Sequence, residues 1–292
     1  MNTSNVSASS LALQLAAVRS GTLGALVGSS ADFDSILQAA SNASSPVDAL
    51  FSKGSGKSVG LSADGHNMSL FDPQSAFDMM SVINKKDVDY KAQYSELSQM
   101  GSGAASLAST AQDLAGISAA TGDADMRTRL QAFVDQYNGW IKRFDADMQK
   151  GGLLSGTQAA QVARHELDAG IDNRFYGARD GVRGLQELGI TTDPVTGLAS
   201  FDTAKFDAAL ARNRSGVVDT VQEFATGFAT AANLLNSAGN FIPNQLNNLS
   251  GAIHYIDANI ASWRSEFGTG SAATPDAQTA RALAAYNKAN AA

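Results

Sequence analysis

Apolar residues after position 73 recur every three or four places, which is the spacing of helices buried on one face. The stretch 74–193 contains no proline. Asp72 followed by Pro73 is typical of a helix start, because aspartate caps the helix and proline suits its first position. This pattern predicts a mainly α fold: an elongated helical bundle and coiled-coil stalk with one small β-hairpin.

Four apolar runs alternate steps of three and four, as coiled-coil seams do. The first is interrupted by Asp87, a polar residue of the kind that fixes register. The last two run in phase on either side of Pro243, which predicts one long rod kinked at this proline. The runs comprise Met80, Ile83, Tyr90, Tyr94 and Leu97; Met126, Leu130, Phe133, Tyr137, Trp140, Phe144 and Met148; Val217, Val221, Phe224, Phe228, Ala231 and Leu235; and Leu246, Leu249, Ile253, Ile256, Ile260, Trp263 and Phe267.

Such seams require partners, because a lone helix would expose its apolar stripe to water. Burial of one large side chain stabilises by roughly 1.5 to 3 kcal/mol. The first seam has the right length to pair with the last, and we expect the residues of these two seams to be the interaction residues of the chain. Ile256, Ile260 and Trp263 are the expected anchors for partner subunits. An ordinary four-helix domain without an assembly role remains the alternative.

The region between the seams contains the predicted β-hairpin, at about 188–201. Ile190 and Thr192 alternate before an Asp-Pro turn, and Asp202 is placed to cap the next helix. A further helix is predicted for 155–171. The segment GSGAAS at 101–106 lacks the preceding strand of a dinucleotide site, and is expected to allow close helix packing or to end a helix.

Both ends of the chain differ from the middle in composition. Residues 1–73 are rich in Ser, Ala, Asn and Gly and predict a flexible region with two brief helices, near 9–18 and 31–40. The segment KGSGKS at 53–58 lacks the first glycine of a phosphate loop and predicts a linker. Residues 268–292 predict a linker and an alanine-rich tail helix in which Leu283 and Tyr286 pack.

The net charge and the few histidines and absent cysteines argue against several classes of function. The net charge is −7 and no basic block exists, which argues against nucleic acid. No apolar stretch is long enough for membrane insertion. Cysteine is absent, and His66, His165 and His254 are far apart, so we expect no metal and no cofactor. Asp145 and Asp147 point to different helix faces and are expected to be solvated, and the chain is not expected to be an enzyme.

Three segments carry a family resemblance: LQAFVDQYNGWIKRF at 130–144, GGLLSG at 151–156, and LQELGITTDPVTGLASFDTAKFDAAL at 185–210. Together they resemble the carboxy-terminal part of the bacterial flagellar filament cap family, hook-associated protein 2. Residues 89–117 resemble its amino-terminal stalk helix. The matching residues are Val134, Asp135, Tyr137, Asn138, Leu153, Leu154, Leu188, Gly189, Ile190, Thr191, Gly197, Asp202, Lys205, Ala209 and Leu210.

The resemblance implies a structural protein of the flagellum, exported by the flagellar apparatus, that self-associates at the filament tip. Large β domains of the family would fall at 118–125, so the chain resembles a reduced member without them. Expected partners are further copies of itself and hook-junction or filament subunits, with an export chaperone as a further candidate. Residues 2–30 are the expected export address. A secreted helical binding protein or adhesin-like factor without an axial role is the alternative.

Overall fold

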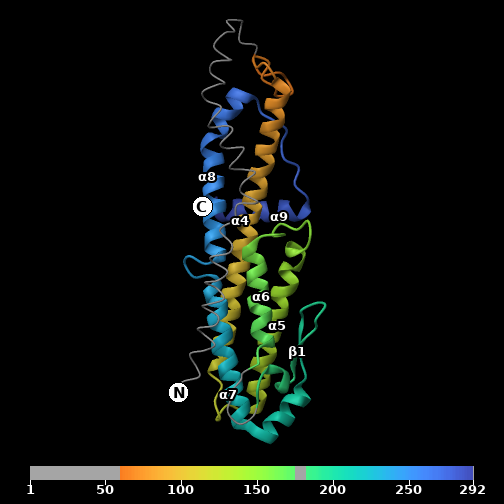
Figure 1. Cartoon of the computed structure of the whole chain (residues 1–292), viewed down its shortest axis with the longest axis vertical. Coiled ribbons are helices and arrows are strands. Elements are labelled where there is room, and N and C mark those ends of the chain that lie inside the picture. Colours follow the sequence, from red (N-terminus) through yellow and green to blue (C-terminus); the bar gives the residue numbers. More distant parts are fainter. Residues whose placement is uncertain (1–59, 175–181, 292) are drawn as a thin grey trace.

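The computed structural model describes residues 60–174 and 182–291, and it is elongated and mainly helical (Figure 1). The predicted fold class is confirmed. In the order of the chain, the described elements are α4 (Pro73–Ala115), α5 (Asp123–Met148), α6 (Gln158–Asp172), the short 3-10 helix η2 (Leu185–Leu188), β1 (Ile190–Thr192), β2 (Ala199–Phe201), α7 (Thr203–Leu235), α8 (Phe241–Phe267) and α9 (Ala277–Asn290).

One half of the molecule is a bundle in which the second half of α4 packs with α5, α6 and α7 (Figure 1). Its core is aromatic. Phe133 of α5 meets Phe224 and Phe228 of α7 edge to face, with ring centroids 5.1 and 5.0 Å apart. Such edge-to-face pairs add to the stabilisation that burial alone provides.

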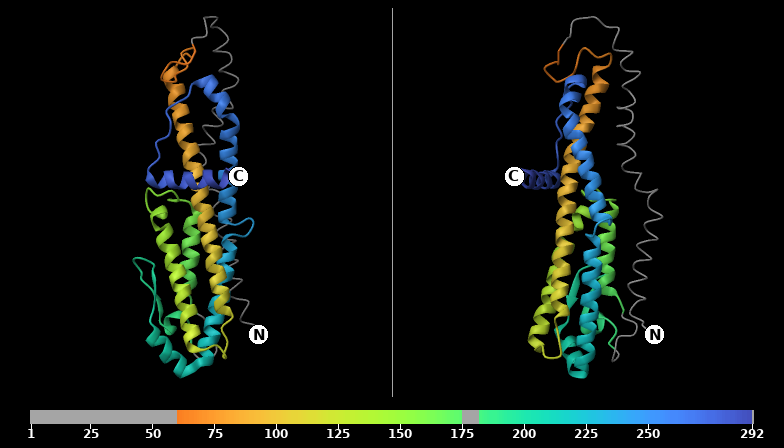
Figure 2. Two further views of the ribbon diagram at one scale, coloured as in Figure 1. Left: turned by 180° about the vertical axis from the view of Figure 1, so that it is seen from behind. Right: turned by 90° about the vertical axis from the view of Figure 1, so that its left-hand side faces the viewer.

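The other half is a stalk, in which the first half of α4 and α8 run antiparallel beyond the bundle (Figure 2). Met80, Ile83 and Ile256 form its own small core. Because two helices meet here in the described part of the chain, each buries one stripe of side chains against the other. The stalk therefore has a much thinner interior than the bundle.

The predicted kink at Pro243 is wrong in position. Helix α7 ends at Leu235, and a loop containing Gly239, with φ 79°, separates it from α8. Pro243 lies in the first turn of α8, where a helix has no use for the missing N–H. The rod is therefore two helices joined by a loop, and the proline helps to start the second helix.

The short predicted elements agree with the structure. Asp72 caps α4, since its carboxylate accepts a hydrogen bond from the Ser75 amide at 3.0 Å. Strands β1 and β2 pair antiparallel with Ile190 opposite Phe201. The helix predicted for 155–171 is α6, and Asp202 caps α7 through the amide of Lys205.

Residues 60–72 fold onto the free end of the stalk, although the sequence placed them in a flexible region. The His66 ring stacks on Phe77 with centroids 4.0 Å apart. Asn67 donates from Nδ2 to the Glu266 carbonyl at 2.8 Å, and Thr269 N–H donates to the Gly65 carbonyl at 2.9 Å. These long-range contacts explain the order, which composition does not reveal. The brief helices and KGSGKS predicted within 1–59 lie outside the described residues.

After this end the chain turns back, and α9 lies across α4 where the bundle gives way to the stalk (Figures 1 and 2). Only Thr279 and Ala282 of α9 are buried, and Leu283 and Tyr286 are partly buried. Among the described helices, none combines the length and apolar character that spanning a membrane requires.

Candidate interaction surface and ion clusters

The structure brings the first and last predicted seams together within one chain, along the α4–α8 pair. Their members divide into two groups by exposure. Fully buried are Met80, Ile83, Leu97, Leu249, Ile253 and Ile256. Partly buried are Tyr90, Tyr94, Leu246, Ile260, Trp263 and Phe267.

This division corrects one of the expected anchors. Ile256 is 1% exposed and packs with Met80 and Ile83, so it stabilises the stalk and cannot reach a partner. Ile260 and Trp263 keep part of their surface free. Tyr255 was missed by the seam pattern, yet it is 40% exposed and its ring lies 5.6 Å from that of Trp263. We call Tyr255, Ile260 and Trp263 the outer face of α8.

The polar seam position, Asp87, belongs to an ion cluster that joins the two stalk helices. Lys91 of α4 lies 2.9 Å from Asp87 and donates to Asp257 of α8 at 2.8 Å. Burial by itself would lower the pKa of Lys91, but hydrogen bonds to the two carboxylates outweigh it and raise that pKa. Since the bridge forms at one alignment of the helices, it favours that register.

A second ion cluster lies where α4, α5 and α9 meet. Arg143 of α5 donates to Glu96 at 2.6 Å and to Asp147 at 3.1 Å, and these two carboxylates are 4% and 2% exposed. Gln278 of α9 also hydrogen-bonds to Asp147. Burial, together with the charge of Asp147, raises the pKa of Glu96. The expectation that Asp147 is solvated is wrong, because the cluster buries it under the tail helix.

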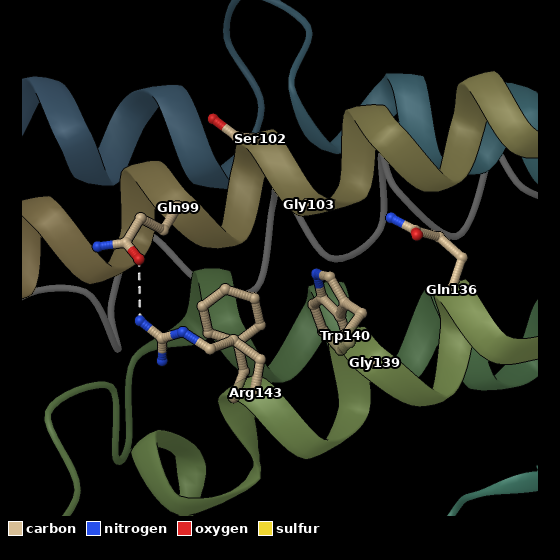
Figure 3. A pocket seen from close by; sticks show the side chains of 8 residues that line it. Gln99, Ser102, Gly103, Gln136, Gly139, Trp140 and Arg143 are labelled. Atoms are coloured by element: carbon tan, nitrogen blue, oxygen red, sulfur yellow. Dashed lines mark hydrogen bonds between the residues drawn. The ribbon is translucent and has the colours of Figure 1, made fainter.

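Next to this cluster a groove of about 360 Å³ runs between α4 and α5 (Figure 3). Its cationic group, Arg143, also donates to Gln99 at 2.9 Å, so its charge is already engaged. A Cβ on Gly103 would come within 2.7 Å of Trp140. The segment at 101–106 therefore lets the two helices approach closely, as one of its two interpretations predicted. The groove is lined by Gln99, Ser102, Gly103, Gln136, Gly139, Trp140, Arg143 and Phe144.

The residues that carry the resemblance hold the hairpin on the bundle. Asn138 accepts from the Ala199 amide at 2.7 Å and donates to the Ala199 carbonyl at 2.8 Å, which satisfies both backbone groups. Tyr137 donates to Asp168 of α6 at 2.6 Å. Burial and this carboxylate together raise the pKa of Tyr137 well above its ordinary value. These motif residues are therefore structural and chemically quiet.

The histidines lie apart in the structure as in the sequence. His165 and His254 are exposed, and His66 lies 3.2 Å from Asp64 at the free end of the stalk. Within residues 60–174 and 182–291, no three His, Cys, Asp or Glu side chains are grouped closely enough to hold a metal ion.

The geometry defines a helical stalk protein, with an antiparallel helix pair extending from a bundle that carries a hairpin. A family model described as the flagellar hook-associated protein 2 C-terminus matches residues 106–270. This is more than half of the chain, and the chain belongs to that family.

Individual relatives are more distant. Flagellar hook-associated protein 2 from Escherichia coli O157:H7 and from Escherichia coli strain K12 are each 23% identical over 171 residues, covering 48% of this chain and 36% of the relative. The crystal structure of the flagellar cap protein FliD D1-D2-D3 domains from Escherichia coli has a TM-score of 0.40 and 23% identity, covering 44% of this chain and 37% of that one. The chain thus matches little more than a third of its curated relatives.

Proposed function

We propose that the chain is a structural assembly protein of the bacterial flagellum that acts by helix pairing and self-association. Membership of the hook-associated protein 2 family supports the flagellar setting over a secreted adhesin-like factor. The proposed mechanism is docking and contains no chemical step. Further copies of the chain, and hook-junction or filament subunits, are the proposed partners, and export through the flagellar apparatus is the proposed route.

The outer face of α8 is the observation that supports this proposal most. Two aromatic rings and an isoleucine lie along a helix whose inner stripe is already buried against α4. Within residues 60–174 and 182–291, Tyr255 is exposed and Ile260 and Trp263 are only partly covered. Burial of such side chains in an assembly is worth roughly 1.5 to 3 kcal/mol each, and buried Tyr and Trp are typical anchors of protein interfaces.

The test places charges on this face while leaving the buried seam residues Ile253 and Ile256 unchanged. The double variant Tyr255→Glu with Trp263→Glu should keep the helical circular dichroism of the parent, because Tyr255 is exposed and Trp263 is only partly buried. It should lose self-association and binding to purified flagellar junction proteins, measured as molar mass by light scattering. The matched control is His254→Glu, an exposed change one residue away on the same helix.

The outcome decides whether the outer face of α8 is used for docking. Loss of assembly in the double variant, with His254→Glu assembling normally, supports docking through the outer face of α8. An unchanged molar mass in the double variant would contradict it. Cells that produce only the double variant should also swim less than cells with the control.

A further inference from the structure

Helix α9 lies outside the family match, which ends at residue 270, so its role does not follow from the family. It binds across the boundary of bundle and stalk through several specific contacts. Gln278 hydrogen-bonds to Asp147 of α5, the charge of Arg281 acts on Glu96 of α4, and the rings of Tyr286 and Tyr94 meet edge to face at 5.8 Å. We call Tyr94, Glu96 and Asp147 the α9 site.

The buried carboxylates of this site determine which side chains α9 can place against it. Its two carboxylates are almost fully buried, so a helix laid over them has to supply polar or positive groups there. Gln278 and Arg281 do so from one side of α9, while Thr279 and Ala282 provide small buried contacts. Arg143 pairs with Glu96 and with Oδ2 of Asp147, so a helix without Gln278 would remove the hydrogen bond that α9 makes to Oδ1 of Asp147.

The helical structure of α9 depends more on its contacts with the α9 site than on the helix propensity of its own sequence. It has 14 residues, and isolated helices of this length are marginal in water even when rich in alanine. Its own cap is local: the Asp276 carboxylate accepts a hydrogen bond from Thr279 N–H at 2.7 Å. We therefore expect α9 to be helical only where an α9 site holds it.

A short strap connects α9 to the free end of the stalk. Asn84 donates from Nδ2 to the carbonyls of Thr269 and Ser271, both at 2.9 Å, and Ser271 N–H donates to Ser81 at 2.7 Å. Beyond this clip, residues 272–276 reach at most about 17 Å when fully extended. Opening the clip frees residues 270–276, because Thr269 is still held by the Gly65 carbonyl, and lengthens the reach to about 24 Å when fully extended.

We propose that α9 is exchanged between copies, so that the α9 site of one chain binds the α9 of a second copy in the assembly. This inference rests on the proposed self-association, which brings a second site within reach. Every contact between α9 and its site is conserved on exchange, so the free-energy difference resides only in the strap and its clip. Exchange would lock neighbouring stalks together at the boundary with the bundle.

The experiment uses full-length chains that each carry one new cysteine, because the natural sequence has none. Tyr94→Cys is mixed with heavy-nitrogen-labelled Tyr286→Cys at concentrations where the chain self-associates, and a short bis-maleimide is added. A covalent heterodimer identified by mass supports exchange, since the two cysteines are on different chains. The control replaces Tyr94→Cys with Val195→Cys, at the exposed tip of the hairpin.

Two further arms make the result decisive. Adding Asn84→Ala to both chains should raise the heterodimer yield several-fold, because it opens the clip. The double variant Tyr94→Cys with Tyr286→Cys reports whether the linker can join the two positions within one chain. Oligomers by light scattering, with internal cross-links but no heterodimer above the control, overturn exchange and leave self-association standing. A monomer at every concentration contradicts both proposals.

Discussion

The bundle and the stalk share one long helix, α4, but they bury it in different ways. Around the second half of α4, helices α5 and α7 close a core in which large aromatic rings are fully covered. Around the first half, the described neighbours are α8, α9 and residues 60–72, and several apolar side chains stay partly exposed. The bundle therefore has the larger buried core, whereas the stalk keeps apolar side chains partly exposed, which the proposed docking would cover.

The largest expected effect is a loss of stability in the bundle core. Phe133→Ala removes a ring that is fully buried and touches Phe224 and Phe228, and such truncations cost about 3–5 kcal/mol. The urea midpoint followed by circular dichroism should fall clearly. Phe71→Ala, at a side chain that is 90% exposed, is the matched control and should leave the midpoint unchanged. A small shift for Phe133→Ala would show that the bundle core repacks freely.

A smaller and more local effect is expected in the stalk. Ile256→Ala opens a cavity beside Met80 and Ile83, but the two helices can move together, which favours the low end of the usual cost, about 2 kcal/mol. Hydrogen exchange of α8 amides should accelerate roughly thirtyfold while α5 and α6 stay protected. Tyr255→Ala, at the exposed neighbouring position, should not accelerate it. Equal acceleration in α5 would show that stalk and bundle open as one unit.

Most of the fold follows from local patterns. Local sequence patterns predict the cap at Asp72 and the hairpin at 190–201, because capping chemistry and turn residues act over short distances. The pairing of α4 with α8 could be predicted because each helix carries a regular apolar stripe that needs a partner. The error at Pro243 has the same origin, since proline suits a first turn as well as a kink. The loop before it, with Gly239 in the left-handed region, decides between the two.

The parts that were missed depend on contacts between distant segments. Residues 60–72 read as flexible, yet they are held by groups about 200 positions away, such as Glu266. The sequence predicts Asp147 as a surface acid, yet it is buried in contact with Arg143 of its own helix and with Gln278 of α9, 131 positions away. Tyr255 falls beside the seam, so its exposure follows from the inner stripe being filled. In each case the sequence gives the residue type but not what lies against it.

The smallest expected effect concerns the boundary of the two regions, at Glu96. Its pKa is raised in the folded chain above the ordinary glutamate value of 4.5, by burial first and then by Asp147. The folded state therefore holds this proton more tightly than the unfolded state does. The stability that Glu96 contributes is complete below that ordinary value and is lost as the pH rises through the raised pKa.

Glu96→Gln should flatten this part of the pH dependence, because glutamine does not titrate. The free energy of unfolding, measured by urea titration followed by circular dichroism, should decline from pH 4.5 upward in the parent and decline less in the variant. The capping carboxylates Asp72 and Asp276 have lowered pKa values and act in the opposite sense at lower pH, and they are common to both proteins. Asp145→Asn, at a half-exposed carboxylate beside the cluster, should keep the parental slope. An identical slope in Glu96→Gln would show that ionisation of Glu96 does not affect the stability of the folded chain.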